Sequence, residues 1–326
     1  MPDELANKSI KVQSDALSKS FAKYRSDLIQ IPSYSIDKAA QYMSKRNGIR
    51  GKETVGELSG DMQIGPYHTT RTDENGVTIT GRTLETFLGS SVKPFEPNAV
   101  RETIYGSSEF QGDALKNQPI TKLVGFYLMG KLGEAFYRSL FTAKRNETGD
   151  KTVDLYDGFK TIADAEIQSG AISTDKGNFF QTQKVTDVNA VEVFEAFYDA
   201  ADEKLQDENT ILFCNTAEKR AYEKDYRATY GNLSYNDGFK KLYLDGEDKC
   251  QIVGLSCVPR GFKLITPQSN MLLGLATEGD KCSFDVAENK LSHFLVDFVA
   301  TMYFGVQFES ISPERLLVGE DPVVAG

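Results

Sequence analysis

The side chains best suited to chemistry in this sequence are its two histidines, His68 and His293. A histidine that acts as a general base or a metal ligand needs a partner, such as a second ligand one helical turn away or a carboxylate. Neither histidine has a ligand at i+4 or a carboxylate motif beside it, and the sequence contains no Gly-x-Ser-x-Gly nucleophile elbow. The pattern favours two isolated side chains without a catalytic role.

Residues 274–281, Gly-Leu-Ala-Thr-Glu-Gly-Asp-Lys, superficially resemble a phosphate-binding loop. Such a loop needs a lysine directly after the second glycine, followed by serine or threonine. Here Asp280 intervenes, and its charge would repel a phosphate. The stretch is therefore interpreted as a loop between two strands.

Two groups of carboxylates remain as candidates. Residues 73–76, Asp-Glu-Asn-Gly, lack the bidentate glutamate of a calcium loop and indicate a turn. The second group lies at the end of a predicted helix, and its members are Asp199, Asp202, Glu203, Asp207 and Glu208. Paired carboxylates can do acid–base chemistry, but no apolar pocket is indicated around these, which favours a solvated helix face that could meet lysines of a neighbouring subunit. We predict no catalytic, cofactor-binding or metal-binding residues, and no enzyme activity.

The composition is that of a folded protein without general affinity for nucleic acid. The chain of 326 residues is 40% hydrophobic and 26% charged, with a net charge of −10 and a pI near 5.0. A net negative protein repels phosphate backbones unless a basic patch overcomes the repulsion. The basic cluster within residues 45–52 is interpreted as a solvated segment.

The four cysteines have no C-x-x-C spacing and so match neither a zinc site nor a redox motif. They are Cys214, Cys250, Cys257 and Cys282. Cys214 and Cys257 lie in apolar strand-like runs, where a free thiol behaves as a small hydrophobe. We predict reduced, structural thiols, as in a cytosolic protein, although a disulfide stays open. No secretory signal is expected, and no uncharged apolar stretch reaches the roughly 18 residues of a membrane span.

The pattern of the first 110 residues predicts extensions of the fold rather than a compact core. Residues 1–50 are polar with apolar positions at helix-like spacing, which indicates an arm that packs on something else. Glycines recur in residues 51–110, and a turn signal at 74–76 precedes period-two alternation at 77–80. Pro94 and Pro97 interrupt strand pairing, so a long projecting hairpin is predicted.

Residues 119–143 give the strongest helix signal, with a proline at the first turn and apolar residues over much of the circumference. Such a helix suits a brace lying against a sheet. A strand is predicted at 153–156, then a helix at 159–168 closed by Gly170. A helix at 189–205 follows, with Asp187 as its candidate cap. The next elements are a strand at 210–215, a helix at 216–230, a strand-like run at 252–259, and a second short strand ending in 265–270 and 271–275. Strands at 281–286 and 291–308 follow, although a buried helix stays open for the second of these runs, and a segment at 315–318 closes the fold.

This order of elements resembles the coat proteins of tailed bacteriophages with the HK97-type fold. Members of that family begin with a flexible arm, continue with a long hairpin called the E-loop and a spine helix, and then form an axial domain before returning to the peripheral sheet. Residues 252–259, Ile-Val-Gly-Leu-Ser-Cys-Val-Pro, are similar to a phrase frequent in the family, which often has proline where this chain has Ser256.

The resemblance implies an α+β fold in four parts. These are an N-terminal arm at 1–60, an extended hairpin at 61–110, a peripheral domain with the spine helix at 111–157 and 291–326, and an axial domain at 158–290. Some family members join subunits through a lysine–asparagine bond. Lys93 lies in the hairpin-like region, but no asparagine partner can be matched, so that chemistry is not carried over.

By the same resemblance the chain is a structural subunit that self-assembles into the icosahedral shell of a phage or prophage. Its partners are other copies of itself, as pentamers and hexamers, together with scaffolding and portal proteins. DNA is enclosed without sequence-specific binding, no membrane is involved, and the virion is assembled in the bacterial host cytoplasm.

An arm and a hairpin cannot bury all their own apolar groups, so these should pack on adjacent copies. The candidate contact residues are Leu28, Ile29, Leu84, Phe87, Leu88 and Phe95. Two alternatives stay open. One is an encapsulin-like compartment, whose subunits begin with an interior helix, as the pattern in residues 15–30 permits. The other is an enzyme of unrecognised type.

Overall fold

The structure is a computed structural model that describes residues 36–49, 51–59, 67, 78–96, 120–231, 243–244, 247–275, 283–288 and 295–322. The chain divides into two compact units. As far as they are described, unit 1 holds Met1–Lys38, Leu88–Phe136 and Ala276–Tyr303, and unit 2 holds Ala39–Phe87, Tyr137–Leu275 and Phe304–Gly326. None of the described helices is long and apolar enough to cross a membrane.

A five-stranded mixed sheet forms the centre of unit 2, with the order β5-β12-β8-β6-β7. Its strands are β5 (Phe179–Gln181), β12 (Leu317–Glu320), β8 (Phe262–Pro267), β6 (Thr210–Asn215) and β7 (Cys250–Leu255). β8 runs antiparallel to both of its neighbours, whereas β6 pairs parallel with β7 and β12 pairs parallel with β5. β8 is buried at all six positions, which fits its place in the middle of the sheet.

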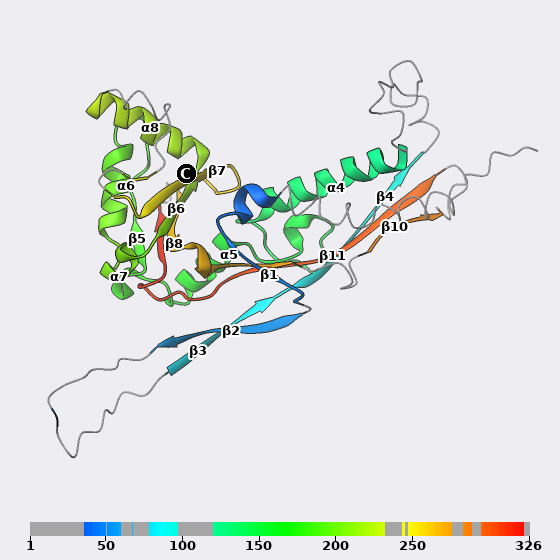
Figure 1. Cartoon of the computed structure of the whole chain (residues 1–326), viewed down its shortest axis with the longest axis horizontal. Coiled ribbons are helices and arrows are strands. Elements are labelled where there is room, and N and C mark those ends of the chain that lie inside the picture. The colour runs from blue at the N-terminus through cyan, green and yellow to red at the C-terminus, as the bar shows by residue number, and fades with distance from the viewer. Residues whose placement is uncertain are drawn as a thin grey trace, which may run out of the picture. The chain divides into compact units, whose positions relative to one another are not determined.

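Two helices, α6 (Ala190–Asp199) and α8 (Thr216–Tyr230), close one side of this sheet (Figure 1). Phe194 of α6 and Tyr222 of α8 meet with ring centroids 5.3 Å apart. A capping box starts α8 directly after β6, because the Asn215 side chain accepts a hydrogen bond from the Ala217 N–H at 2.9 Å. The Glu218 carboxylate in turn accepts from the Asn215 N–H at 3.1 Å.

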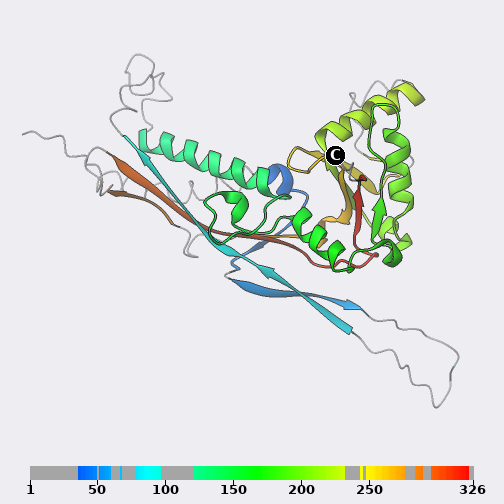
Figure 2. The ribbon, with the colours of Figure 1, turned by 180° about the vertical axis from the view of Figure 1, so that it is seen from behind.

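On the other side of β8 lies an aromatic cluster built around α5 (Phe159–Gln168). Phe141 contacts both Phe159 and Phe262, at centroid distances of 5.6 and 6.3 Å. Figure 2 shows α5 and the sheet from behind. The predicted helix at 159–168 is confirmed, and Gly170 follows it with a φ of 74°.

Unit 2 also contains a short parallel pair and a two-stranded hairpin. β1 (Ser44–Asn47) pairs parallel with β9 (Met271–Leu275), and β9 pairs antiparallel with the end of β11 (Val296–Phe308). β2 (Lys52–Ser59) pairs antiparallel with β3 (Thr78–Glu85) over eight residues each. Among the described strands these two pair with each other alone, and Figure 1 shows them side by side.

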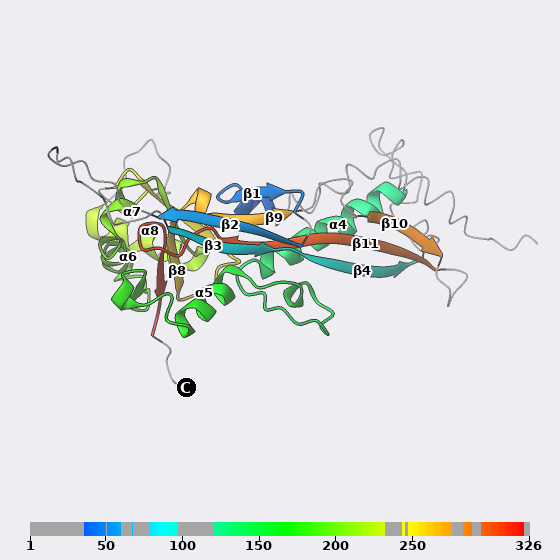
Figure 3. The ribbon, with the colours of Figure 1, turned by 90° about the horizontal axis from the view of Figure 1, so that it is seen from below.

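Unit 1 contains most of the long helix α4 (Ile120–Ser139) and a β-sheet segment. β10 (Ser283–Glu288) pairs antiparallel with residues 296–301 of β11, and β4 (Phe87–Phe95) pairs with β11 as well. α4 lies over this segment, with Met129 and Phe136 buried and Tyr127 exposed (Figures 1 and 3).

The predicted helix at 189–205 is divided in two. α6 ends at Asp199, and α7 (Glu203–Asp207) begins after Asp202, whose side chain accepts a hydrogen bond from the Lys204 N–H at 2.9 Å. Asp187 is not the cap of α6, because Asn189 holds that position while Asp187 pairs with Lys224 at 2.8 Å.

Two other predicted elements differ in type or length. Residues 153–156 form no strand, because Thr152–Asp154 is a 3-10 turn closed by the Asp154 side chain, which accepts from the Lys151 N–H at 3.1 Å. The helix predicted to reach residue 143 ends at Ser139. Beyond it, the Phe141 and Ala143 carbonyls accept hydrogen bonds from the N–H groups of Lys160 and Gly158.

The predicted boundaries also need correction at both ends. Residues 39–59 belong to unit 2, whereas the predicted arm reached residue 60, and the first hairpin strand begins at Lys52 instead of after residue 60. The strand at Leu317–Glu320 does not join the sheet of β11, because it pairs with β8 and β5. Conversely β9 and β10, predicted within 158–290, pair with β11.

Candidate functional site

The base of the β2–β3 hairpin rests on the body of unit 2 through one of its faces. The pairing register places Val55 opposite Arg82 and Glu53 opposite Leu84, so these four side chains share that face. Val55 and Leu84 are buried in a cluster with Ile49 and Leu272. The opposite face is solvated, as exposed Thr54 and Thr83 indicate.

Thr86 holds the chain where it leaves the hairpin. Its hydroxyl donates to the Ile49 carbonyl at 3.0 Å and accepts from the Gly51 N–H at 3.1 Å. Two glycines allow this close approach. A Cβ added at Gly305 would lie 2.1 Å from the Glu85 carbonyl oxygen, and one at Gly274 would lie 2.7 Å from the Thr86 methyl group. The base of the hairpin is therefore held tightly by backbone and side chain together.

The six candidate contact residues differ in how exposed they are, and two of them lie outside the described residues. Leu28 and Ile29 lie outside the described residues. The expectation for Leu84 is wrong, because its side chain is 0% exposed within its own subunit and cannot reach another copy. Phe87 is half-buried, with the Arg145 guanidinium 3.6 Å above its ring.

Leu88 and Phe95, both on β4, remain accessible, Leu88 with 49% of its surface exposed. Sequence reasoning missed a third residue of this strand, Val92, which is 55% exposed. Leu88, Ser90 and Val92 are exposed at alternate positions and so share a face. These residues form an exposed stripe along β4. The alternation of side chains between the two faces of a strand would have predicted it from residues 88–92.

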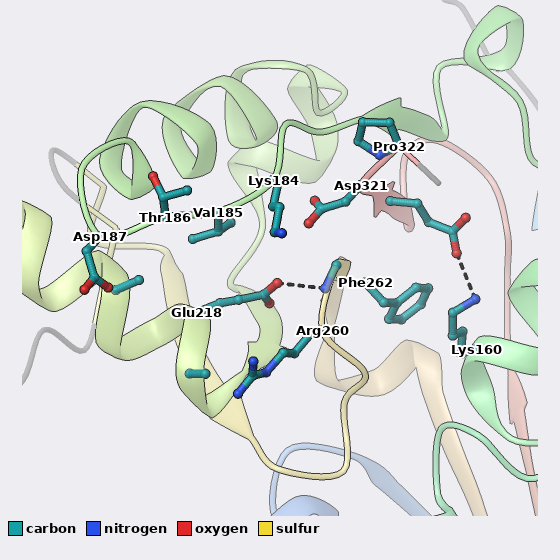
Figure 4. Close-up of a pocket in the computed structure, with 14 residues that line it drawn as sticks. Lys160, Lys184, Val185, Thr186, Asp187, Glu218, Arg260, Phe262, Asp321 and Pro322 are labelled. Atoms are coloured by element: carbon teal, nitrogen blue, oxygen red, sulfur yellow. Dashed lines mark hydrogen bonds and ion pairs between the residues drawn. The ribbon is translucent and has the colours of Figure 1, made fainter. Parts of the chain in front are cut away.

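A pocket of about 540 Å³, lined by both charged and apolar residues, opens elsewhere in unit 2 (Figure 4). It is lined by the segment before α6, the first turns of α8, the start of β8 and the residues after β12. Glu218 reaches across it from α8 and accepts a hydrogen bond from the Gly261 N–H at 2.8 Å. Lys184 and Arg260 also line the pocket.

A fully buried lysine lies next to this pocket. Lys263 Nζ is 2.7 Å from Asp321 Oδ1, donates to the Thr182 hydroxyl at 3.2 Å and is 4.0 Å from Glu218 Oε1. An ammonium removed from water is tolerated when carboxylates and hydrogen bonds replace its hydration. Lys263 thereby ties β8 to the end of β12 and to α8.

A second lysine joins α5 to β12. Lys160 Nζ lies 2.6 Å from Asp164 and 3.1 Å from Glu320. Burial alone would lower the pKa of Lys160, but the hydrogen bonds to Asp164 and Glu320 outweigh it, so the pKa is raised. Burial raises the pKa of Glu320 although Lys160 opposes that shift. The contact with Glu320 joins α5 to β12, whereas the contact with Asp164 lies within α5.

Three of the five carboxylates that sequence analysis singled out between residues 199 and 208 make structural contacts. Asp202 caps α7, Asp207 is 3.3 Å from Lys249, and Glu208 is 3.5 Å from Arg315. Among the described residues, no three or more His, Cys, Asp or Glu side chains are grouped to hold a metal ion. His68, His293 and residues 73–76 lie outside those residues, as do positions 276–281 of the glycine-rich stretch.

Three of the four cysteines are described, and Cys214, Cys250 and Cys257 are free and buried, as predicted. Burial raises the pKa of each thiol, to about 12 for Cys250 and Cys257. A thiol with so high a pKa stays protonated and unreactive at neutral pH. These cysteines are packing residues.

No protein-family model and no curated protein matches the sequence. Solved structures, in contrast, share its fold over nearly the full length of both chains. A chain of the procapsid of satellite phage P4 matches with a TM-score of 0.56 and 14% identity, covering 91% of this chain and 99% of that chain. The capsid of an empty GTA particle matches with a TM-score of 0.60 and 11% identity, covering 88% and 90%.

The capsid of cyanophage P-SCSP1u is also similar, with a TM-score of 0.53, 11% identity and coverage of 86% of each chain. At such identities the likeness establishes the fold. The chain has the mixed α+β fold of HK97-type capsid proteins, as its order of elements indicated.

Proposed function

We propose that this protein is the subunit of an icosahedral shell of a phage, prophage or GTA-type particle, and that the shell encloses DNA. The observation that carries the proposal is the fold shared with chains of several such particles over 86% or more of this chain. In this proposal many copies form pentamers and hexamers, and a scaffold and a portal assist assembly. The net charge of −10 gives the protein no general attraction for DNA, which suits a shell that encloses DNA without binding it tightly.

The finer division of the fold follows the same proposal. The β2–β3 hairpin corresponds to the E-loop, α4 to the spine helix, and the five-stranded sheet with α6 and α8 to the axial domain. The supporting observations are a hairpin whose strands pair only with each other among the described strands, and a long helix over a sheet. Shell subunits need such extensions, because closed shells arise from modest contacts repeated by symmetry.

Contacts between copies are proposed for the exposed face of β4 that carries Leu88 and Val92, and for Phe87 and Phe95 on the other face of the same strand. The first two carry large apolar side chains that their own chain leaves about half uncovered. Apolar side chains repeated along an exposed strand face mark an interaction surface more often than an inert one. The arm residues Leu28 and Ile29 stay candidates.

The direct test is to express the protein, with and without candidate scaffold proteins, and to examine it by light scattering and negative-stain electron microscopy. Closed particles of uniform diameter are expected. Monomers at every salt and protein concentration, with the scaffold present, would refute a shell function. Particles that hold enzyme cargo and no DNA when isolated from their host would favour the encapsulin-like alternative.

A variant pair tests the contact surface. Leu88→Asp combined with Val92→Asp should abolish particles and leave a folded subunit, because two charges cannot be buried unpaired in an interface. Val188→Asp is the matched control, since Val188 is an exposed valine on a different segment. Equal assembly by the β4 variant and the wild type would remove this strand from the interface.

A further inference from the structure

The direction of the β2–β3 hairpin depends on a few contacts at its base. Among the described strands, β2 and β3 pair with no strand other than each other, and β3 is joined to a larger sheet only through Thr86 and the following strand β4, which pairs with β11. The apolar cluster of Val55, Leu84, Ile49 and Leu272 holds one face. Apolar contacts are not directional, and a small rotation of the hairpin would keep most of that burial. Polar contacts must therefore select one direction.

Arg82 lies on the same face of β3, and its side chain makes polar contacts with two other elements, α5 and β11. Its Nη2 donates to Glu166 Oε1 at 2.7 Å and to Gln307 Oε1 at 3.2 Å, and its Nε donates to the Phe308 carbonyl at 3.1 Å. One guanidinium thus connects the hairpin with α5 and with the end of β11. Gln307 adds a bond from its Nε2 to the Thr83 carbonyl at 3.1 Å.

The chemistry of this contact makes it directional. The guanidinium is a rigid planar fork, and its donors meet acceptors from separate elements only in one orientation. The Arg82 and Glu166 side chains are just 13% and 24% exposed, so water replaces their bond poorly if the hairpin swings away. By contrast, Lys52 and Glu85 of the same hairpin lie 3.4 Å apart with 68% and 37% exposure, and both belong to the hairpin itself.

We propose that Arg82 is a positioning residue that fixes the direction of the hairpin in the free subunit, before another copy binds. Its contact with Glu166 and Gln307 acts as a latch between the hairpin and the body of unit 2. The consequence for assembly rests on the proposed shell function. Subunits whose hairpin already points in the competent direction assemble at a lower concentration, because apparent affinity is reduced by the fraction of molecules that are competent.

The latch is tested in the subunit alone by measuring a distance across it. Spin labels at Thr54→Cys, on the solvated face of the hairpin, and at Ser169→Cys, both exposed positions, report the hairpin against the end of α5. Cys282→Ser removes the cysteine outside the described residues, and the three buried thiols resist labelling. One narrow distance distribution is expected for the parent protein, and a broad or multiple distribution for Arg82→Ala.

Two further variants distinguish loss of the latch from a general loss of folding. Glu166→Gln removes the charge of the acceptor without shortening the side chain, and should broaden the distribution in part. Lys52→Ala removes an ion pair from the same hairpin and should leave it unchanged. A narrow distribution in Arg82→Ala, with normal thermal unfolding, would overturn the latch, and so would a broad distribution in the parent protein.

Assembly is measured separately on unlabelled proteins. If about a tenth of Arg82→Ala subunits hold the competent direction, the critical concentration for particle formation rises about tenfold, while Lys52→Ala stays at the parent value. If the parent protein never assembles, the shell function is contradicted. The latch is then still tested by the distance distribution, because that measurement is made on the subunit alone. Assembly of Arg82→Ala at the parent concentration would overturn the role of the latch in assembly.

Discussion

Lys263 is a residue whose surroundings can be tested by substitution. Lys263→Met keeps the volume of the side chain but leaves Asp321 and Glu218 without their buried cation. Removal of one partner of a buried ion pair costs about 3–5 kcal/mol of unfolding free energy. Urea unfolding followed by circular dichroism should show a loss of this size.

The matched control is Lys249→Met, which removes the pair with Asp207 on the surface. These side chains are exposed and 3.3 Å apart. Surface pairs contribute less than about 1 kcal/mol, so this variant should unfold near the wild-type midpoint. Equal losses in the two variants would show that Lys263 is not held as a buried charge.

The buried thiols permit a second prediction at single residues. In a Cys282→Ser background, a thiol reagent at pH 8 should label none of Cys214, Cys250 and Cys257 in the folded protein, and all three in guanidinium chloride. Their raised pKa values favour the neutral thiol in the folded state. The contribution of these thiols to the free energy of unfolding is fully present below pH 9, the ordinary pKa of a thiol. It is lost as the pH rises through the raised pKa, which is about 12 for Cys250 and Cys257. Labelling of the folded protein would contradict the burial.

For the secondary-structure elements, the close approach of β3 and β11 gives the sharpest prediction. Gly305→Ala places a methyl group 2.1 Å from the Glu85 carbonyl oxygen, which belongs to the backbone and cannot rotate away. Overpacking of this kind costs about 1–3 kcal/mol. The midpoint of urea unfolding should fall accordingly.

Gly130→Ala in α4 is the opposite case, because an added Cβ meets nothing within 4 Å there. Alanine in a helix interior is up to about 1 kcal/mol better than glycine, so this variant should be neutral or more stable. If both alanine variants lost stability alike, steric contact would not explain the requirement for glycine at residue 305.

Across the two units, truncation distinguishes an appended arm from an integral segment. Deletion of residues 1–60 removes β1, which pairs with β9, and β2, which pairs with β3. It also removes Ile49 and Val55 from the cluster that buries Leu84. We expect this deletion to abolish cooperative unfolding of the part that contains β9 and β3.

Deletion of residues 1–35 keeps β1 and β2 and should leave a cooperatively folded protein whose assembly can be examined. Circular dichroism and thermal unfolding of the two truncated proteins provide the comparison. A stable fold after deletion of residues 1–60 would restore the long arm that the sequence suggested.

Much of the element order followed from local pattern. The helix at 216–230, the strand at 210–215 and the helix at 159–168 were predicted with the bounds that the structure has, because apolar period and capping residues are local signals. The exposed stripe of β4 was found in part, through Leu88. The pocket between α8 and the end of β12 was not predicted, because its residues come from separate segments that stretch from Lys160 to Pro322.

The amino-acid sequence by itself determined where most helices and strands form, that the three described cysteines are free packing residues, and the α+β order that points to a capsid fold. The tertiary structure alone decided which side chains remain free for other copies. Leu84 is apolar and lies in a hairpin, as Leu88 lies in the next strand, yet one is buried and the other half exposed. Burial depends on what packs opposite a strand face, and for Leu84 that is Leu272, a residue from the far end of the chain.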